Sequence, residues 1–316
     1  MTKEKVGLIG FGSVGRELAV HLVKAYGALG VVDSDASRVD AMLAVGATPA
    51  ADVAGLAAEC DVILLSLPNP VAVRAVLDGP AGMIANAKRG LLIIDTTSSD
   101  PETGTEMARR AAKHGITYVE APVSTPVAGA TGPETVKQGA ATFLVGAPKE
   151  DFPRIEAILK PMGRYVYHVG EIGQGSTMKL VTNYIAGATR VAIAEGVAVA
   201  AAMGIPAQRT MEICRNANAG SQSLEQAISR LTADDPEHVS FSIDLRYKDF
   251  RLANELARQV GVPMPMGAQI VELYQMMVAK GWGRRDINSI VAFMAEMAGV
   301  DTDQPVSRWK SDSAKP

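Results

Sequence analysis

The sequence predicts an α/β domain with a mostly parallel sheet, followed by an all-α domain, with one long helix joining the two. Three observations support this. Short apolar runs alternate with helical patterns in the first half of the chain. A proline-free stretch from Gly173 to Gly204 is long enough for a single helix. Beyond Pro206, only helical patterns follow. We expect a first domain over residues 1–172, a second over 173–300 and a flexible tail over 301–316.

Composition places the chain among globular proteins that bind small molecules. Of its 316 residues, 47% are hydrophobic and 21% charged, and the net charge is -3 without a basic cluster, so nothing favours nucleic acid or a membrane surface. Cys60 and Cys214 lack metal-binding spacing, and the four histidines are scattered, so we expect no metal site. The start of the chain carries no signal-peptide pattern, and we expect a cytoplasmic protein.

The first strand, over residues 5–10, leads into a glycine-rich turn and then a helix. This turn follows the pattern GxGxxG in a strand–turn–helix context, which is typical of a Rossmann dinucleotide-binding domain. Its glycines permit a tight turn, close approach of a pyrophosphate, and helix–strand packing, while backbone N–H groups face the phosphates. The residues predicted to contact the cofactor here are Gly10, Phe11, Gly12, Ser13, Val14 and Gly15.

The second strand, over residues 28–32, ends at Asp33, where a carboxylate can accept hydrogen bonds from the adenosine ribose. A carboxylate repels the 2′-phosphate of NADP, and no arginine follows immediately, so we predict NAD rather than NADP. The alternative is that Asp33 only caps a turn.

Helices over residues 36–45 and 53–59 flank a short strand over 48–50, and further strands cover 61–68 and 90–94. Continuous apolar strands of this kind are typical of a parallel sheet covered on both faces. Ligands bind at the carboxyl ends of such strands. We therefore assign Leu67, Pro68, Asn69 and Ser98 to the nicotinamide side of the cofactor, although each segment could also be a plain turn.

In the long helix, Lys179 and Asn183 lie four residues apart and so share one face. Ser176 is the expected N-cap. A lysine near a helix N-terminus has its charged form mildly disfavoured, which suits a group that releases a proton. Taken alone, Lys179 would more readily be interpreted as a solvated lysine near a helix start.

Together these motifs resemble the β-hydroxyacid dehydrogenase family, which includes 3-hydroxyisobutyrate dehydrogenase and tartronate semialdehyde reductase and is related to 6-phosphogluconate dehydrogenase. The resemblance covers roughly residues 5–298. It rests on segments that occur in the family's order, namely GLIGFGSVG, the Leu67–Pro68 pair, DTTS before Pro101, EAPVS, GQGSTMK with Asn183, and Lys248–Asp249.

The resemblance implies roles for individual residues. The family's pattern GxGxxxKxxxN makes Lys179 the general acid/base and Asn183 the residue that holds the substrate. Ser124 matches the serine that binds the substrate carboxylate, and Lys248 matches a lysine near nicotinamide and substrate. Ser98 takes the cofactor contact of the family's D-x-S-T, although Thr97 and Ser98 exchange residue types relative to that pattern.

The chain departs from the family after Ser124, where two glycines are replaced by Thr125 and Pro126. Proline removes a backbone N–H that could bind an anion. The chain is also longer than the family through residues 131–138. We expect a reshaped substrate pocket, in which the Thr125 hydroxyl partly replaces the lost donor and 3-hydroxyisobutyrate itself is not the substrate.

The second domain is predicted to be helical throughout, over residues 207–216, 223–231, 245–259, 267–280 and 287–297. Gly187 and Ala188 allow close helix packing, and so much apolar helix surface indicates a homodimer or homotetramer. Substrate recognition is expected to depend on this domain, through residues such as Asn218, Gln222 and Arg246.

The expected function is NAD-dependent interconversion of a small 3-hydroxy acid, or a related hydroxy compound, with its semialdehyde or ketone, in a cleft between the two domains. The sequence does not decide the substrate or the physiological direction. The alternatives are an imine reductase, which reduces C=N bonds, and a non-catalytic dinucleotide-binding scaffold. Retention of Lys179 and Asn183 counts against both.

Overall fold

The computed structural model describes residues 4–125, 132–231 and 239–300. The chain divides into two compact units, and the division falls within the long helix, between Lys179 and Leu180. The predicted boundary at residues 172–173 places this helix wholly in the second domain. The predicted tail, 301–316, lies outside the described residues.

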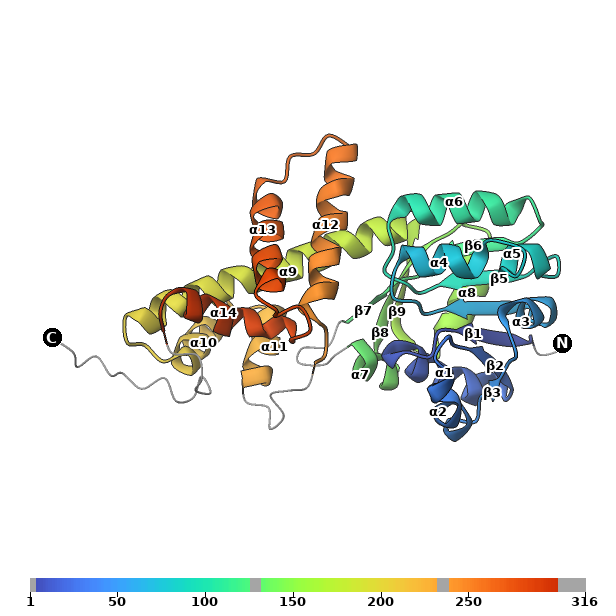
Figure 1. The fold of residues 1–316 in the computed structure, drawn as a ribbon, viewed down its shortest axis with the longest axis horizontal. Coiled ribbons are helices and arrows are strands. Elements are labelled where there is room, and N and C mark those ends of the chain that lie inside the picture. The colour runs from blue at the N-terminus through green and yellow to red at the C-terminus, as the bar shows by residue number, and fades with distance from the viewer. Residues whose placement is uncertain (1–3, 126–131, 232–238, 301–316) are drawn as a thin grey trace. The chain divides into compact units, whose positions relative to one another are not determined.

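The first unit is built on one nine-stranded sheet (Figure 1). Its strands are β1 (Val6–Ile9), β2 (Leu29–Val32), β3 (Thr48–Pro49), β4 (Val62–Leu65), β5 (Leu92–Asp95), β6 (Thr117–Glu120), β7 (Val123–Ser124), β8 (Ala141–Gly146) and β9 (Gly163–Gly170). The strand order is β3-β2-β1-β4-β5-β6-β8-β7, with β9 paired to β8. The first six of these strands are parallel, while β8 is antiparallel to β6 and β7. The mostly parallel sheet is confirmed, whereas β8 and β9 were not predicted.

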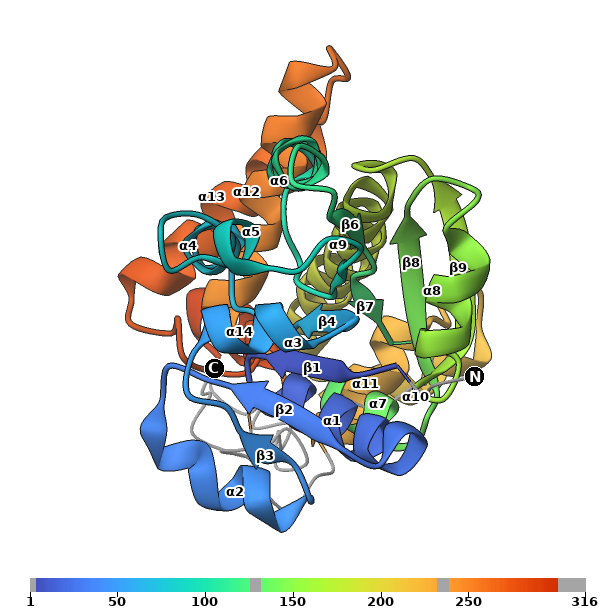
Figure 2. The same ribbon diagram turned by 90° about the vertical axis from the view of Figure 1, so that its right-hand side faces the viewer.

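Helices cover both faces of this sheet (Figures 1 and 2). They are α1 (Ser13–Tyr26), η1 (Ala36–Arg38), α2 (Val39–Ala44), α3 (Val53–Glu59), α4 (Pro70–Leu77), α5 (Met83–Asn86), α6 (Pro101–Ala112), α7 (Gly132–Lys137) and α8 (Phe152–Leu159). Alternate residues of the central strands enter two separate cores. Leu64 packs with Leu18 of α1 in one core, and Ile63 with Met107 of α6 in the other. Side chains two residues apart share a face of a strand, so a strand buried on both faces must be apolar throughout.

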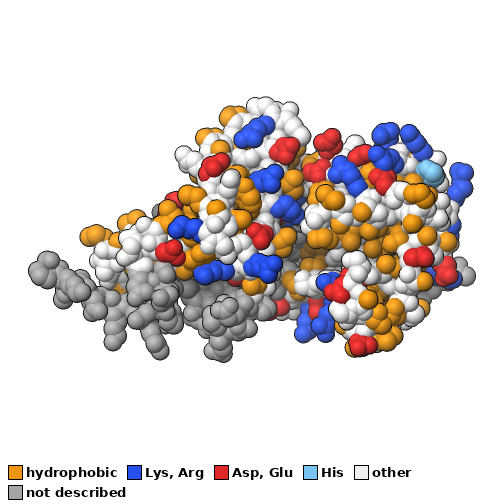
Figure 3. Space-filling model, in the orientation of Figure 1, with side chains coloured by type: hydrophobic (Ala, Val, Ile, Leu, Met, Phe, Trp, Pro, Cys, Tyr) orange, Lys and Arg blue, Asp and Glu red, His pale blue; other side chains and the backbone are white. Residues whose placement is uncertain are grey.

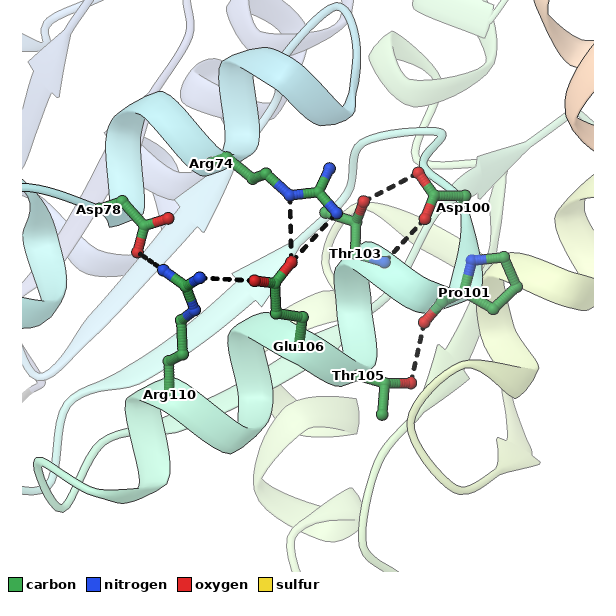
Figure 4. A network of polar contacts seen from close by, with 8 residues as sticks. All are labelled: Arg74, Asp78, Asp100, Pro101, Thr103, Thr105, Glu106 and Arg110. Atoms are coloured by element: carbon green, nitrogen blue, oxygen red, sulfur yellow. Dashed lines mark hydrogen bonds and ion pairs between the residues drawn. The ribbon is translucent and has the colours of Figure 1, made fainter.

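Ion pairs hold α4 against α6 (Figure 4). Glu106 accepts from Arg74 at 3.1 Å and from Arg110 at 2.6 Å, and Arg110 also pairs with Asp78 at 2.7 Å. Asp100 caps α6 by accepting the Thr103 N–H at 2.7 Å. These contacts fix the loop between β5 and α6, which carries Ser98.

The second unit is all-helical, as predicted. After α9 (Gln174–Ala202) come α10 (Ala207–Asn216), α11 (Gln222–Leu231), α12 (Ile243–Gln259), α13 (Pro265–Ala279), η2 (Ile287–Ser289) and α14 (Ile290–Met297). α12 crosses α9 where Gly187 meets the ring of Phe250, and a Cβ at Gly187 would collide with that ring. The predicted close packing at Gly187 therefore has a defined partner.

By length and composition α9 could cross a membrane, and no other helix of the described residues could. However, α9 buries the polar side chains of Asn183 and Arg190 among hydrogen-bond partners in the helical unit. This is the behaviour of a core helix in a globular unit. On the face shown in Figure 3, acidic and basic side chains are interspersed over the described residues.

Candidate functional site

The register of the sheet aligns the carboxyl ends of its parallel strands. In the order β2, β1, β4, β5 and β6, the paired residues at this edge are Val32, Ile9, Leu65, Asp95 and Glu120. Each predicted cofactor segment begins within three residues of this row. The fold therefore brings Asp33, the glycine turn, Leu67 and the Ser98 loop to one edge of the sheet, where parallel sheets bind their ligands.

The glycine turn has the geometry that a bound pyrophosphate requires. Gly10 has φ +96°, and a Cβ there would collide with the carbonyl of Ser66. A Cβ at Gly15 would collide with the carbonyl of Gly10. At Gly12 a Cβ would meet only Nη1 of Arg38, at 3.7 Å. Two glycines thus shape the turn and the third leaves its surface open, so these residues fit a dinucleotide.

Asp33 is held rigidly at the end of β2. Its Oδ2 accepts the Phe11 N–H at 2.5 Å and Nη1 of Arg38 at 3.1 Å, and its Oδ1 accepts the Asp35 N–H at 2.9 Å. The side chain is only 8% exposed. Sequence reasoning missed Arg38, because it follows Asp33 by five residues. The short η1, capped by Asp35, turns the chain back and brings Arg38 to the carboxylate.

The Leu67 and Ser98 segments are joined by hydrogen bonds. The Thr97 hydroxyl accepts the Leu67 N–H at 3.1 Å, and the Thr96 hydroxyl donates to the Leu65 carbonyl at 2.6 Å. Ser98 itself is half-buried. In the first segment, Pro68 is exposed, and Asn69 caps α4 by accepting the Ala72 N–H through its amide oxygen at 2.9 Å. Asn69 therefore caps a helix in addition to its predicted contact with the cofactor.

Buried Asp95 supports the same loop from beneath. Its Oδ2 accepts the Tyr118 hydroxyl at 2.6 Å, and its Oδ1 accepts the Thr97 N–H at 2.8 Å. Burial raises the pKa of Asp95. Because one oxygen bonds to Tyr118 of the neighbouring strand β6 and the other to Thr97 of its own loop, Asp95 ties this loop to the sheet.

Glu120, at the end of β6, caps the long helix α9. Its Oε1 accepts the N–H groups of Gly173 at 2.9 Å and Ser176 at 2.8 Å, and its Oε2 accepts the Ser176 hydroxyl at 2.7 Å. Burial raises the pKa of Glu120, while these hydrogen bonds oppose the rise. The prediction of Ser176 as N-cap is wrong. The helix begins at Gln174, and a side chain 56 residues away satisfies N–H groups that a local cap would serve.

Lys179 and Asn183 lie one turn apart on α9, and each is 8% exposed. The Asn183 amide nitrogen donates to Oδ2 of Asp249 at 2.7 Å. Its oxygen is therefore the atom of this amide that can accept from a substrate hydroxyl. Nζ of Lys248 lies 3.5 Å from Oδ1 of the same Asp249, in an ion pair without hydrogen-bond geometry. Asp249 thus connects two of the predicted site residues.

Ser124 and Thr125 are half-buried at the end of β7, where Ser124 pairs with Thr142 of β8. Pro126 lies outside the described residues, as does Thr131 at the start of the longer segment. Residues 132–137 of that segment form α7, which packs on α1 through a 2.8 Å hydrogen bond between Nε2 of His21 and the Val136 carbonyl. Among the described residues, no group of three potential ligands could hold a metal ion.

These features define an NAD(P)-dependent oxidoreductase, with a dinucleotide-binding turn in one unit and a buried lysine and asparagine on a connecting helix. The chain belongs to the β-hydroxyacid dehydrogenase family. Residues 5–170 match the domain family described as the NAD binding domain of 6-phosphogluconate dehydrogenase. Residues 173–294 match the domain family described as "NAD-binding of NADP-dependent 3-hydroxyisobutyrate dehydrogenase".

Individual relatives match over nearly their whole length. The chain is 32% identical to 2-(hydroxymethyl)glutarate dehydrogenase of Eubacterium barkeri, over 94% of this chain and 96% of the relative. It is 30% identical to 3-sulfolactaldehyde reductase of Escherichia coli strain K12, over 93% and 97% of the two chains. A solved structure of Mycobacterium tuberculosis 3-hydroxyisobutyrate dehydrogenase with L-serine has the same fold, with a TM-score of 0.82 at 22% identity, covering 93% and 99% of the chains.

Proposed function

We propose that this protein is an NAD-dependent dehydrogenase that interconverts a small 3-hydroxy acid with its semialdehyde or ketone, with Lys179 as general acid/base. The observation that carries the proposal is the burial of Lys179 and Asn183 on one face of α9. Lysine is among the residues least often buried in proteins. A buried amine one turn from a fixed amide is suited to move a proton at an oriented hydroxyl.

In the oxidation direction, the neutral amine of Lys179 accepts the proton of the substrate hydroxyl, and Asn183 holds that hydroxyl through its amide oxygen. When bound at the glycine turn, the nicotinamide dinucleotide supplies the hydride acceptor. In the reverse direction, the Lys179 ammonium donates its proton to the developing alkoxide. Asp249 orients Asn183 and pairs with Lys248, and Ser124 and Thr125 bind the substrate carboxylate.

The preference for NAD is supported by the fixed carboxylate of Asp33. A carboxylate held by three N–H donors cannot turn away from a 2′-phosphate, and its charge would repel that group. Arg38 acts in the opposite sense, because a guanidinium can bind a phosphate. While Arg38 is paired to Asp33, we expect the carboxylate to dominate.

The names of the relatives indicate the substrate class. One acts on 2-(hydroxymethyl)glutarate and another on 3-sulfolactaldehyde, and both compounds carry an anionic group near the reacting carbon. We propose that this chain acts on such an anionic hydroxy compound or its aldehyde, in the cytoplasm.

We also propose a homodimer or homotetramer. A stripe of exposed apolar or small residues runs along α9, on a different face from Asn183. It consists of Val181, Ile185, Ala192, Gly196 and Val199. A second copy of this chain can cover the stripe by helix–helix packing. Light scattering of the purified protein should show an oligomer, and Ile185→Glu should dissociate it. A monomeric wild type would refute this part.

The central experiment measures NAD reduction across 3-hydroxy acids, sugar acids and β-hydroxy amino acids, for wild type and Lys179→Met. Loss of a general acid/base lowers kcat by about 10²–10⁴-fold, and NAD binding should persist in the variant. Exposed Lys160→Met is the matched control and should retain activity. Full activity of Lys179→Met would refute the role of the lysine. Preferential turnover of cyclic imines would replace the proposal by imine reduction.

A further inference from the structure

Two arginines lie buried in the helical unit, Arg190 on α9 at 1% exposure and Arg246 on α12 at 7%. Arg190 donates from Nε to Oδ1 of Asn288 at 3.0 Å and from Nη2 to Oε1 of Gln226 at 2.6 Å. Arg246 donates from Nη1 to the Asn183 carbonyl at 2.9 Å. Every one of these acceptors is neutral, so two buried positive charges are held without an ion pair to any described carboxylate.

Donor groups of this cluster remain without a hydrogen-bond partner. They are Nη1 of Arg190, Nε of Arg246 and the hydroxyl of Tyr274, and all three atoms are buried. Burial, and next the charge of Arg246, lower the pKa of Arg190 to about 10. Asn288, which accepts from Arg190, itself donates to Asp286. Arg246 lies over the ring of Phe241, 4.9 Å from its centroid, and the Phe241 N–H also donates to Asp286, so both arginines border one carboxylate. The charges of both arginines also act on Tyr274. Buried polar groups in native proteins almost always have partners, and such exceptions point to an absent ion, ligand or water.

The nearby carboxylate of Asp286 is committed elsewhere. Its Oδ2 accepts the Ser240 hydroxyl at 2.6 Å, and its Oδ1 accepts Nδ2 of Asn288 at 2.8 Å. Its charge still acts on Arg190 and Tyr274. With Arg190 and Arg246 at +1 each and Asp286 at -1, the cluster retains one positive charge, which favours an anion.

The cluster adjoins a predicted substrate residue. Arg190 follows Asn183 by seven residues, which is two turns of α9, so both lie on one face about 10 Å apart along the axis. The hydrogen bonds of Arg190 direct its guanidinium to Asn288 and Gln226, which leaves Nη1 as the atom for a ligand. Arg246 contacts the Asn183 carbonyl directly. A substrate held at Asn183 would therefore extend toward both arginines.

We infer that Arg190, Arg246 and Tyr274 form a subsite for a second carboxylate of the substrate, so that the enzyme prefers a hydroxy dicarboxylate to the corresponding monocarboxylate. Guanidinium groups match the planar geometry of a carboxylate, and two cations offset the cost of burying it. The inference rests on the proposed function, which defines how the remainder of the substrate binds. Anion binding at the subsite itself can be tested without catalytic turnover.

The kinetic test compares 2-(hydroxymethyl)glutarate with 2-(hydroxymethyl)pentanoate, which differ only in a terminal carboxylate or methyl group. We expect kcat/KM to be about 10–100-fold higher for the diacid, the range for a hydrogen bond to a charged group. Arg190→Met and Arg246→Met should bring the ratio near one, because they slow the diacid far more than the monoacid. Exposed Arg209→Met, the matched control, should keep the wild-type ratio. A wild-type ratio near one, or a ratio kept in both variants, would overturn the inference.

A melting experiment separates this inference from the proposed function. Glutarate should raise the melting temperature of wild type and Arg209→Met in a concentration-dependent way, while its neutral diamide should not. The shift should vanish in Arg246→Met, and also in Arg190→Met if that variant folds. This result would support the subsite even if no hydroxy acid were turned over. No shift in wild type, or an equal shift with chloride or sulfate, would overturn it.

Discussion

If the proposed preference for NAD rests on the Asp33 carboxylate, replacing Asp33 by asparagine should shift cofactor use toward NADP. The substitution keeps the shape of the side chain but removes its charge. In the wild type, this carboxylate binds the Phe11 N–H and Nη1 of Arg38. Asparagine cannot hold Arg38 in an ion pair, so Nη1 of the guanidinium becomes available for a 2′-phosphate beside Gly12, while its Nε stays paired with Asp35 at 3.1 Å.

The size of the effect follows from two contacts. Loss of a charged acceptor for the ribose hydroxyls costs about 1.5–3 kcal/mol, which lowers kcat/KM for NAD by about 10–150-fold. Arg38 is 38% exposed, so its pairing with the phosphate is weakened by solvent, and we expect about a tenfold gain for NADP. The ratio of NAD to NADP efficiency should therefore fall by about 10²–10³-fold.

The assay is kcat/KM for both cofactors, measured with wild type, Asp33→Asn and Asp33→Asn/Arg38→Met on one hydroxy acid. The double variant should lose the gain with NADP and leave the weak NAD activity unchanged. Exposed Asp40→Asn is the matched control on the following helix and should keep the wild-type ratio. A wild type that already uses NADP as efficiently as NAD, or an unchanged ratio in Asp33→Asn, would refute the reasoning.

Three further predictions concern binding, stability and reactivity. Gly12→Ala should fold and lose dinucleotide binding in calorimetry, whereas Gly15→Ala should fail to fold, because its Cβ would collide with a backbone carbonyl; normal binding by Gly12→Ala would contradict this. Glu120→Ala leaves three buried donors unsatisfied and should cost about 3 kcal/mol of stability in denaturant melts. Exposed Glu102→Ala should change stability by under about 0.5 kcal/mol, and equal losses would refute the cap. Burial raises the pKa of the Cys60 thiol to about 11, so at pH 8 about one in 10³ is thiolate, and iodoacetamide should label the more exposed Cys214 first by mass spectrometry. Faster labelling of Cys60 would be inconsistent with its burial.

Sequence patterns predicted correctly those helices and turns whose formation depends mainly on their own residues. The helix over residues 207–216 and the helix over 53–59 have the bounds that periodicity predicted. The glycine turn follows β1 as expected, because the backbone at Gly10 needs a conformation that other residues rarely adopt. The helices α4 to α8 were not predicted individually, and the helix predicted over residues 36–45 is divided into η1 and α2. Sequence patterns also missed β8 and β9, whose pairing depends on distant strands, and the cap of α9.

The sequence by itself determined the two-part architecture, the dinucleotide-binding turn and the helix that carries Lys179 and Asn183, because periodicity and glycine spacing are local properties of the chain. Only the tertiary structure decided that Glu120 caps that helix, that Arg38 pairs with Asp33, and that Arg190 is buried near Arg246. Arg190 and Arg246 are distant in sequence, and Glu120 lies 56 residues before its partner Ser176. No local pattern specifies which distant side chains meet, since that depends on the packing of whole elements.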